Sequence, residues 1–135
     1  MLALEPLIQH RLRELPAFVG WQVRGATAGA DRRSVPAVDV RMGGATVPQV
    51  RKPAVTLQLE WSVTLVVRQG DEAAGQLDAG LTAAISALHN WRPTVAERGW
   101  TELQVARVTE ALFSDAGYVG YDITFTTAAI FHGQP

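Results

Sequence analysis

A strict alternation of apolar and polar residues over residues 55–67 is the clearest pattern in this chain. Every even position is polar except Val66, and every odd position is apolar: Val55, Leu57, Leu59, Trp61, Val63, Leu65 and Val67. A period of two predicts a β-strand with one face in the core and the other against water or a partner.

The length of this strand bears on how the protein is organised. At roughly 3.3 Å per residue, a strand over residues 55–67 spans ~43 Å. A compact domain of 135 residues has a diameter of only about 36 Å. We therefore expect the strand either to bend, or to project from its own domain and be covered by another chain.

Two segments carry the helical period instead. Leucines and isoleucine at helical spacing predict a first helix over about residues 5–15, which Pro16 ends. Asp71 and Glu72 open a second helix, where acidic side chains favour the positive end of the helix dipole, and Asn90 and Pro93 stop it.

The remaining segments predict further strands and the loops that join them. A glycine-bearing stretch at 25–34 reads as a loop, and residues 43–53, with two glycines and two prolines, read as a long flexible hairpin connection. The last residues, 132–135, are expected to form a frayed tail. The other predicted strands are 18–24, 35–42, 103–113 and 119–131.

The resulting element order is α-β-β-β-α-β-β. It favours an α+β fold with a mixed, mainly antiparallel sheet and both helices packed on its apolar face. The opposite face is rich in Thr, Ser and Gln, so it is either solvated or mates with a neighbour. We expect a single domain over residues 1–135, with a hairpin loop protruding at about 43–53.

Composition narrows the class of protein. With 47% hydrophobic and 19% charged residues the chain is typical of a globular domain, and its net charge of -1 gives no bulk attraction to nucleic acid or anionic membranes. The absence of cysteine excludes disulfides and thiolate sites. Neither a signal peptide nor a membrane-spanning run is apparent, so a soluble cytoplasmic product is expected.

Residues that could carry chemistry are scattered. The three histidines, His10, His89 and His132, lack ligand-spaced partners, and the sequence contains no nucleophile elbow. The glycine pairs lack the strand-to-helix context of a phosphate cradle. We therefore expect no enzyme activity, catalytic residue, metal or cofactor.

Two basic pairs, Arg32-Arg33 and Arg51-Lys52, fall in predicted loops, where binding residues concentrate. They are candidates for contacts with phosphate or with an acidic partner, at an interface or in a lumen. Arginine outnumbers lysine eleven to one in this chain, and that bias alone produces such pairs. Both interpretations stay open.

Three of the tryptophans are candidates for core packing or for an interface. Trp61 lies on the apolar strand face and is expected in the core, while Trp91 and Trp100 flank the loop after the second helix. Core packing is the simpler role for the latter two, with an intersubunit anchor as the alternative.

The arrangement as a whole resembles the tail-terminator (minor tail protein U-like) proteins of long-tailed bacteriophages. The resemblance covers nearly the whole chain and rests on the leucine-rich first helix, the Gly/Pro hairpin and several short segments. Those segments are Val35-Pro36-Ala37-Val38, Glu60-Trp61-Ser62-Val63, Ala87-Leu88-His89-Asn90-Trp91-Arg92-Pro93 and Gly120-Tyr121-Asp122-Ile123-Thr124-Phe125-Thr126-Thr127.

The resemblance implies a structural protein without catalytic residues. Such a protein assembles as a homo-hexameric ring on the last ring of the tail tube, stops tube polymerisation and presents a surface to the head connector. Its implied partners are its own copies, the tube protein and the connector, with at most transient DNA passage and no membrane. Its place is the head-proximal end of the virion tail, after assembly in the host cytoplasm.

The residues themselves leave other functions open. A head–tail connector or an adaptor of an injection device is a related alternative, and a small monomeric ligand-binding domain is one of a different class. Within the ring hypothesis, residues 43–53 reach an adjacent subunit, and Arg32, Arg33, Arg51 and Lys52 face the lumen or a neighbouring ring.

Overall fold

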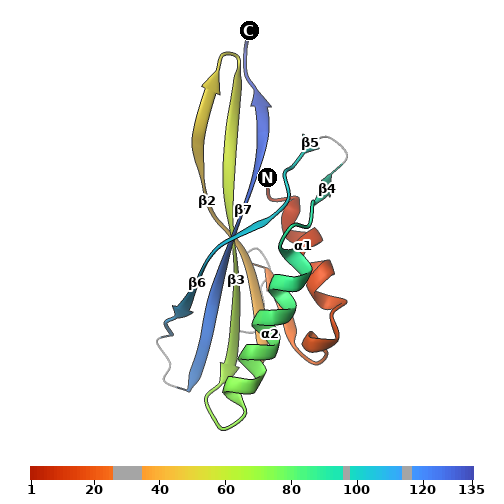
Figure 1. Ribbon diagram of the computed structural model, residues 1–135, viewed down its shortest axis with the longest axis vertical. Coiled ribbons are helices and arrows are strands. Elements are labelled where there is room, and N and C mark those ends of the chain that lie inside the picture. Colours follow the sequence, from red (N-terminus) through yellow and green to blue (C-terminus); the bar gives the residue numbers. More distant parts are fainter. Residues whose placement is uncertain (26–34, 96–97, 114–116) are drawn as a thin grey trace.

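The computed structural model describes residues 1–25, 35–95, 98–113 and 117–135. Its two α-helices are accompanied by a short 3-10 helix and by seven strands within these ranges (Figure 1). In chain order the elements are α1 (Leu4–Arg13), η1 (Pro16–Phe18), β1 (Gln22–Gly25), β2 (Ala37–Arg51), β3 (Ala54–Arg68), α2 (Ala73–Leu88), β4 (Thr94–Val95), β5 (Arg98–Gly99), β6 (Gln104–Ala111) and β7 (Tyr118–His132).

Five of the strands form one sheet in the order β1-β2-β3-β7-β6. β1 runs parallel to β2, and every other neighbouring pair is antiparallel. β4 and β5 form a separate small hairpin. The prediction of an α+β fold with a mixed, mainly antiparallel sheet is confirmed.

The core lies between one face of this sheet and the two helices, which cover the same side (Figure 1). β3 and β7 pair so that Trp61 lies opposite Phe125, and Val63 opposite Ile123. All four side chains are fully buried. The core side of α2 carries Gly80, where a Cβ would strike the Leu65 side chain, so the missing side chain lets helix and sheet approach closely.

The predicted elements agree with the structure where the hydrophobic period is long. β3 covers the whole predicted strand, and each α-helix ends within two residues of its expected bounds. The strand predicted at 18–24 begins later, because Pro16 opens a 3-10 turn and the strand starts only at Gln22. The β4–β5 hairpin was not predicted, since two-residue strands are too short to show a period.

The predicted loop at 43–53 is wrong. β2 continues to Arg51, and only Lys52 and Pro53 form the turn into β3. The register shifts between Met42 and Gly44, and between Thr46 and Gln49, show that β2 accommodates its glycines and Pro48 as irregularities within a strand. The tail is also shorter than expected, because β7 extends through His132.

The helices cover only part of the long strands. β3 has 15 residues and spans ~50 Å at strand geometry, whereas the 16 residues of α2 span ~24 Å. Accordingly β3 alternates buried and half-buried residues from Leu59 to Leu65, but Ala54 through Gln58 are only half-buried. On the N-terminal side of Leu59, toward the β2–β3 turn, the sheet is a single layer of three strands that projects past the helices (Figure 1). We call this part, residues 43–59 and 127–132, the arm.

Candidate functional site

The arm presents apolar side chains to solvent. One face of the arm continues the face of the sheet that packs on the helices. On this face Val55 pairs with Val50 of β2 and with Phe131 of β7. Val50 is 61% exposed. On the other side Thr56 pairs with Ile130, which is 55% exposed. A single-layer sheet with apolar residues open on both faces is typical of an interaction surface.

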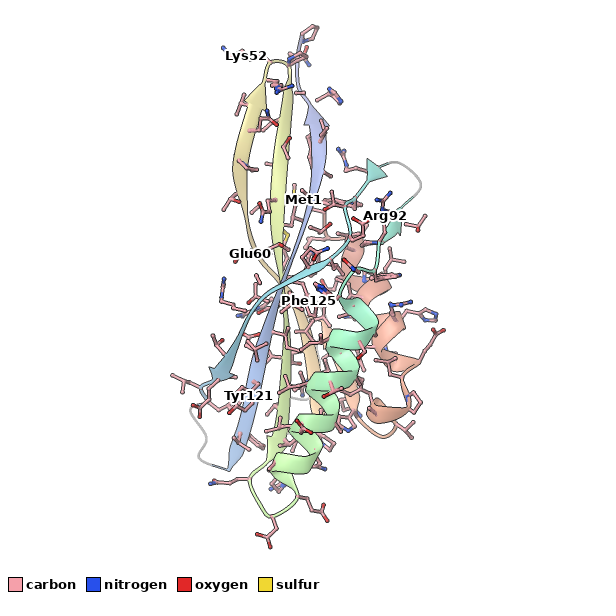
Figure 2. All side chains as sticks on the ribbon, in the orientation of Figure 1. Met1, Lys52, Glu60, Arg92, Tyr121 and Phe125 are labelled. Carbon is pink, nitrogen blue, oxygen red and sulfur yellow. The ribbon has the colours of Figure 1, made fainter. Side chains whose placement is uncertain are left out.

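Two of the predicted site residues lie at the tip of the arm. Arg51 is the last residue of β2 and Lys52 stands in the turn to β3 (Figure 2). Both are exposed, and no ion pair joins either of them to a carboxylate in the described ranges. The other two, Arg32 and Arg33, lie outside the described residues.

A short segment before β6 lies along the β7 edge of the arm. The Thr101 N–H donates to the Ala128 carbonyl at 2.9 Å, and Thr127 Oγ1 donates to the Thr101 carbonyl at 2.6 Å. Beside them the Trp100 ring meets Phe131 edge-on, with 6.1 Å between the ring centroids. We call residues 98–101 the strap, since they tie the loop after α2 to the arm.

Arg98 completes the contact between strap and arm. Its Nη1 donates to the Ile130 carbonyl at 2.7 Å, and its guanidinium carbon lies 3.5 Å from the centroid of the Phe131 ring. Cation–π contact and a charge-assisted hydrogen bond together fix the guanidinium in one position. The sequence prediction missed this residue, because its partners lie more than 30 positions away along the chain.

The polar face of the sheet carries carboxylates that already have partners. Asp122 Oδ1 accepts hydrogen bonds from the Ser62 and Thr64 hydroxyls, each at 2.8 Å. Glu60 pairs with Arg107 across 3.4 Å. Each carboxylate is matched by its own donors, so the described part of this face is a structural network.

The titratable groups give no sign of a catalytic centre in the described ranges. His10 pairs with Glu14 at 3.0 Å on the surface, and His89 Nδ1 accepts the Val105 N–H at 3.1 Å, which ties the end of α2 to β6. The pKa of Glu102 is held below its usual 4.5 by a backbone hydrogen bond and by Arg92, on an exposed surface. No group of three metal-ligating side chains occurs among the described residues.

No helix in the described ranges combines the length and the apolar composition needed to cross a bilayer.

Comparison with known proteins identifies the family. The model of the family described as "Phage tail terminator protein" matches residues 1–135, the whole chain. This chain belongs to the phage tail terminator family. The resemblance inferred from the sequence is therefore confirmed, and the protein is a structural tail protein of a phage-type virion.

Solved structures agree on the fold of this tail terminator family member. A chain in the structure titled "Virion of native gene transfer agent (GTA) particle" superposes with a TM-score of 0.70 at 16% sequence identity, over 95% of each chain. At that identity the match shows a shared fold. No protein of curated function matches this chain in sequence.

Proposed function

We propose that this protein caps the tail tube as a homo-hexameric ring, ends tube polymerisation and forms the tail side of the head–tail joint. Membership of the tail terminator family supports the proposal. The structural observation that carries it is the arm, a single layer of sheet that extends beyond the helices (Figure 1).

The arm supports assembly because of what an isolated chain leaves uncovered. Strands in stable domains bury at least one face against a second layer, and a bare sheet of a few strands is only marginally stable in water. In the arm, Val47 and Val50 of β2 and Ile130 of β7 are all more than half exposed. A neighbouring chain packed on the arm would supply the missing layer.

A closed ring requires two different matching surfaces on every subunit, since each copy contacts the next head to tail. We assign the arm to one of these surfaces, so that it reaches the adjacent subunit. Its tip, with Arg51 and Lys52, then faces the lumen or a neighbouring ring. DNA would pass such a lumen only transiently, since tight binding to phosphates would oppose its movement.

The ring, the tube protein and the head connector would meet at the head-proximal end of the tail, after assembly in the host cytoplasm. The decisive experiment combines two measurements. Light scattering of the purified protein over a range of concentrations, alone and with tube protein, reports the ring. Electron microscopy of tails made with and without the protein reports termination, with over-long tubes expected in its absence.

The tip variant Arg51→Ala/Lys52→Ala tests the assigned surface. It should reduce ring formation or tube docking, while the double substitution Arg41→Ala/Arg68→Ala, also of exposed cations but away from the tip, serves as the matched control. A protein that stays monomeric with tube protein and leaves tail length unchanged would refute the proposed function. Unchanged capping by the tip variant would refute only the role of the tip.

A further inference from the structure

A hollow of about 720 Å³, open to solvent, lies where the strap passes the arm. Its volume falls within the usual range for ligand sites. Polar groups and small apolar side chains line it together, and the lining residues within the described ranges include no Asp or Glu. Those that matter for binding are Arg98, His132, Thr56, Thr101, Ala128 and Ile130.

Arg98 is the fixed cation of this hollow. The Phe131 ring and the Ile130 carbonyl hold its guanidinium, and that carbonyl accepts from only one of the five N–H donors. The described residues place no carboxylate within ion-pair distance of it, whereas Arg24, Arg92 and Arg107 each have one. A positioned guanidinium with donors to spare can bind an anion without first losing side-chain freedom.

The surroundings reinforce the preference for negative charge. The arm and the strap together contain no Asp or Glu, although the whole chain has a net charge of -1. Their Arg and Lys side chains are Arg51, Lys52 and Arg98. Because the hollow is partly enclosed by apolar groups, the field of these cations is less screened there than on an open surface.

We propose that the hollow binds a carboxylate side chain in an extended acidic segment of another virion protein. The Arg98 fork donates to the two carboxylate oxygens, and Thr56, which also lines the hollow, has a hydroxyl that can donate as well. Ala128 and Ile130 contact the methylenes of the bound side chain. This inference rests on the proposed function, since it names the chemistry of a partner that the arm meets in the assembled tail.

The lining favours an acidic peptide over a DNA phosphate. DNA-binding proteins gain affinity by neutralising several phosphates along the backbone, roughly 6–10 for a typical site. Here one guanidinium is fixed in a hollow whose other described lining residues include no Arg or Lys. That arrangement matches a single carboxylate on a short aliphatic stem.

The test uses the full chain, labelled with 15N, and a tetraglutamate peptide blocked at both ends. We expect saturable NMR shifts at the Arg98 side-chain N–H and at the backbone of residues 128–132. Arg98→Gln should weaken peptide binding about tenfold or more. Arg98→Lys should weaken it less, because lysine keeps the charge but lacks the planar fork of donors. Arg92→Gln, at an exposed cation outside the hollow, should stay within about twofold of wild type.

Several results would overturn the inference. They are the absence of saturable shifts in the wild-type chain, equal binding of a tetraglutamine peptide, equal binding by a folded Arg98→Gln variant, and tighter binding of a short DNA duplex or inorganic phosphate at the same residues. If Arg98→Gln does not fold, Thr56→Val replaces it, with a smaller expected loss. Peptide binding needs no ring, so failed tube capping with intact peptide binding would count against the proposed function alone.

Discussion

Arg24 of β1 and Asp39 of β2 lie side by side in the parallel strand pair and form a two-pronged ion pair. The Nε–Oδ1 distance is 2.6 Å and the Nη2–Oδ2 distance is 3.0 Å. The Arg24 side chain is only 7% exposed, so the charge depends on its partners. β1 is a short edge strand of four residues, and this pair helps to fix it to the sheet.

Asp39→Asn should therefore lower the free energy of unfolding by about 1–3 kcal/mol, because a buried guanidinium loses its charged acceptor. Urea denaturation measures the change. The matched control is Glu102→Gln at the exposed pair with Arg92, which should shift the urea midpoint much less, because solvent screens that pair. Equal effects of the two substitutions would show that burial does not set the strength of the first pair.

Glu102 itself gives a prediction about pH. Since a backbone hydrogen bond and Arg92 lower its folded-state pKa below 4.5, its contribution is present above the unfolded pKa and is lost as pH falls through the folded value. An NMR titration of the Glu102 side chain should show a midpoint below 4.5, and Arg92→Gln should raise it. An unchanged midpoint in Arg92→Gln would show that Arg92 does not lower the pKa of Glu102.

Alanine substitutions at Gly120 and at Gly75 should have opposite effects on stability. A Cβ at Gly120 would run into the backbone of Leu65, which cannot move without breaking the β3–β7 pairing, whereas Gly75 in α2 has open space around it. We expect Gly120→Ala to lower stability by about 2–4 kcal/mol. Gly75→Ala should raise it by about 0.5–1 kcal/mol. Thermal and urea unfolding test both, and a tolerated Gly120→Ala would refute the close approach.

Trp61 is fully buried, and its indole N–H has no hydrogen-bond partner among the described residues. Trp61→Phe removes that unpaired donor along with some volume, so the two effects partly offset each other. We expect a loss of about 1–2 kcal/mol for Trp61→Phe and about 3–5 kcal/mol for Trp61→Ala. Similar losses in both variants would indicate that the N–H does have a partner in solution.

The exposed apolar residues of the arm should matter for assembly and little for folding. Val50→Thr and Ile130→Thr should change the unfolding free energy of the free chain by less than about 0.5 kcal/mol, because both side chains are mostly exposed. The same variants should weaken association by about tenfold or more in light scattering with tube protein. Val19→Thr, 80% exposed and outside the arm, is the control that should leave association unchanged.

The sequence was most informative where the core buries one face of an element over many consecutive residues. The alternation through Trp61 predicted β3, and the same reasoning predicted the face of β7 that carries Phe125, because burial selects every second residue. In the outer half of β2 no core exists to select residues, so its glycines and prolines looked like a loop. The strand-length argument predicted that β3 would either bend or project from its domain, and the structure shows it projecting past the helices.

The candidate site was only partly accessible from sequence. Arg51 and Lys52 stand at the tip of a tight hairpin instead of in the long loop that the sequence predicted, and their contacts in an assembly stay a prediction. Arg98 carried no local signal. Its position depends on Ile130 and Phe131, which only the folded chain brings next to the strap.

The irregular outer edge of β2 has a consequence for the free chain. Regular unpaired strand edges invite copies of a protein to join edge to edge into aggregates. Here register shifts at Met42–Gly44 and Thr46–Gln49 interrupt that edge, and Pro48, within the second shift, has no N–H to donate. We therefore expect newly made copies to resist joining through the β2 edges of their arms, which leaves the exposed apolar side chains of the arm available to the proposed neighbouring subunit.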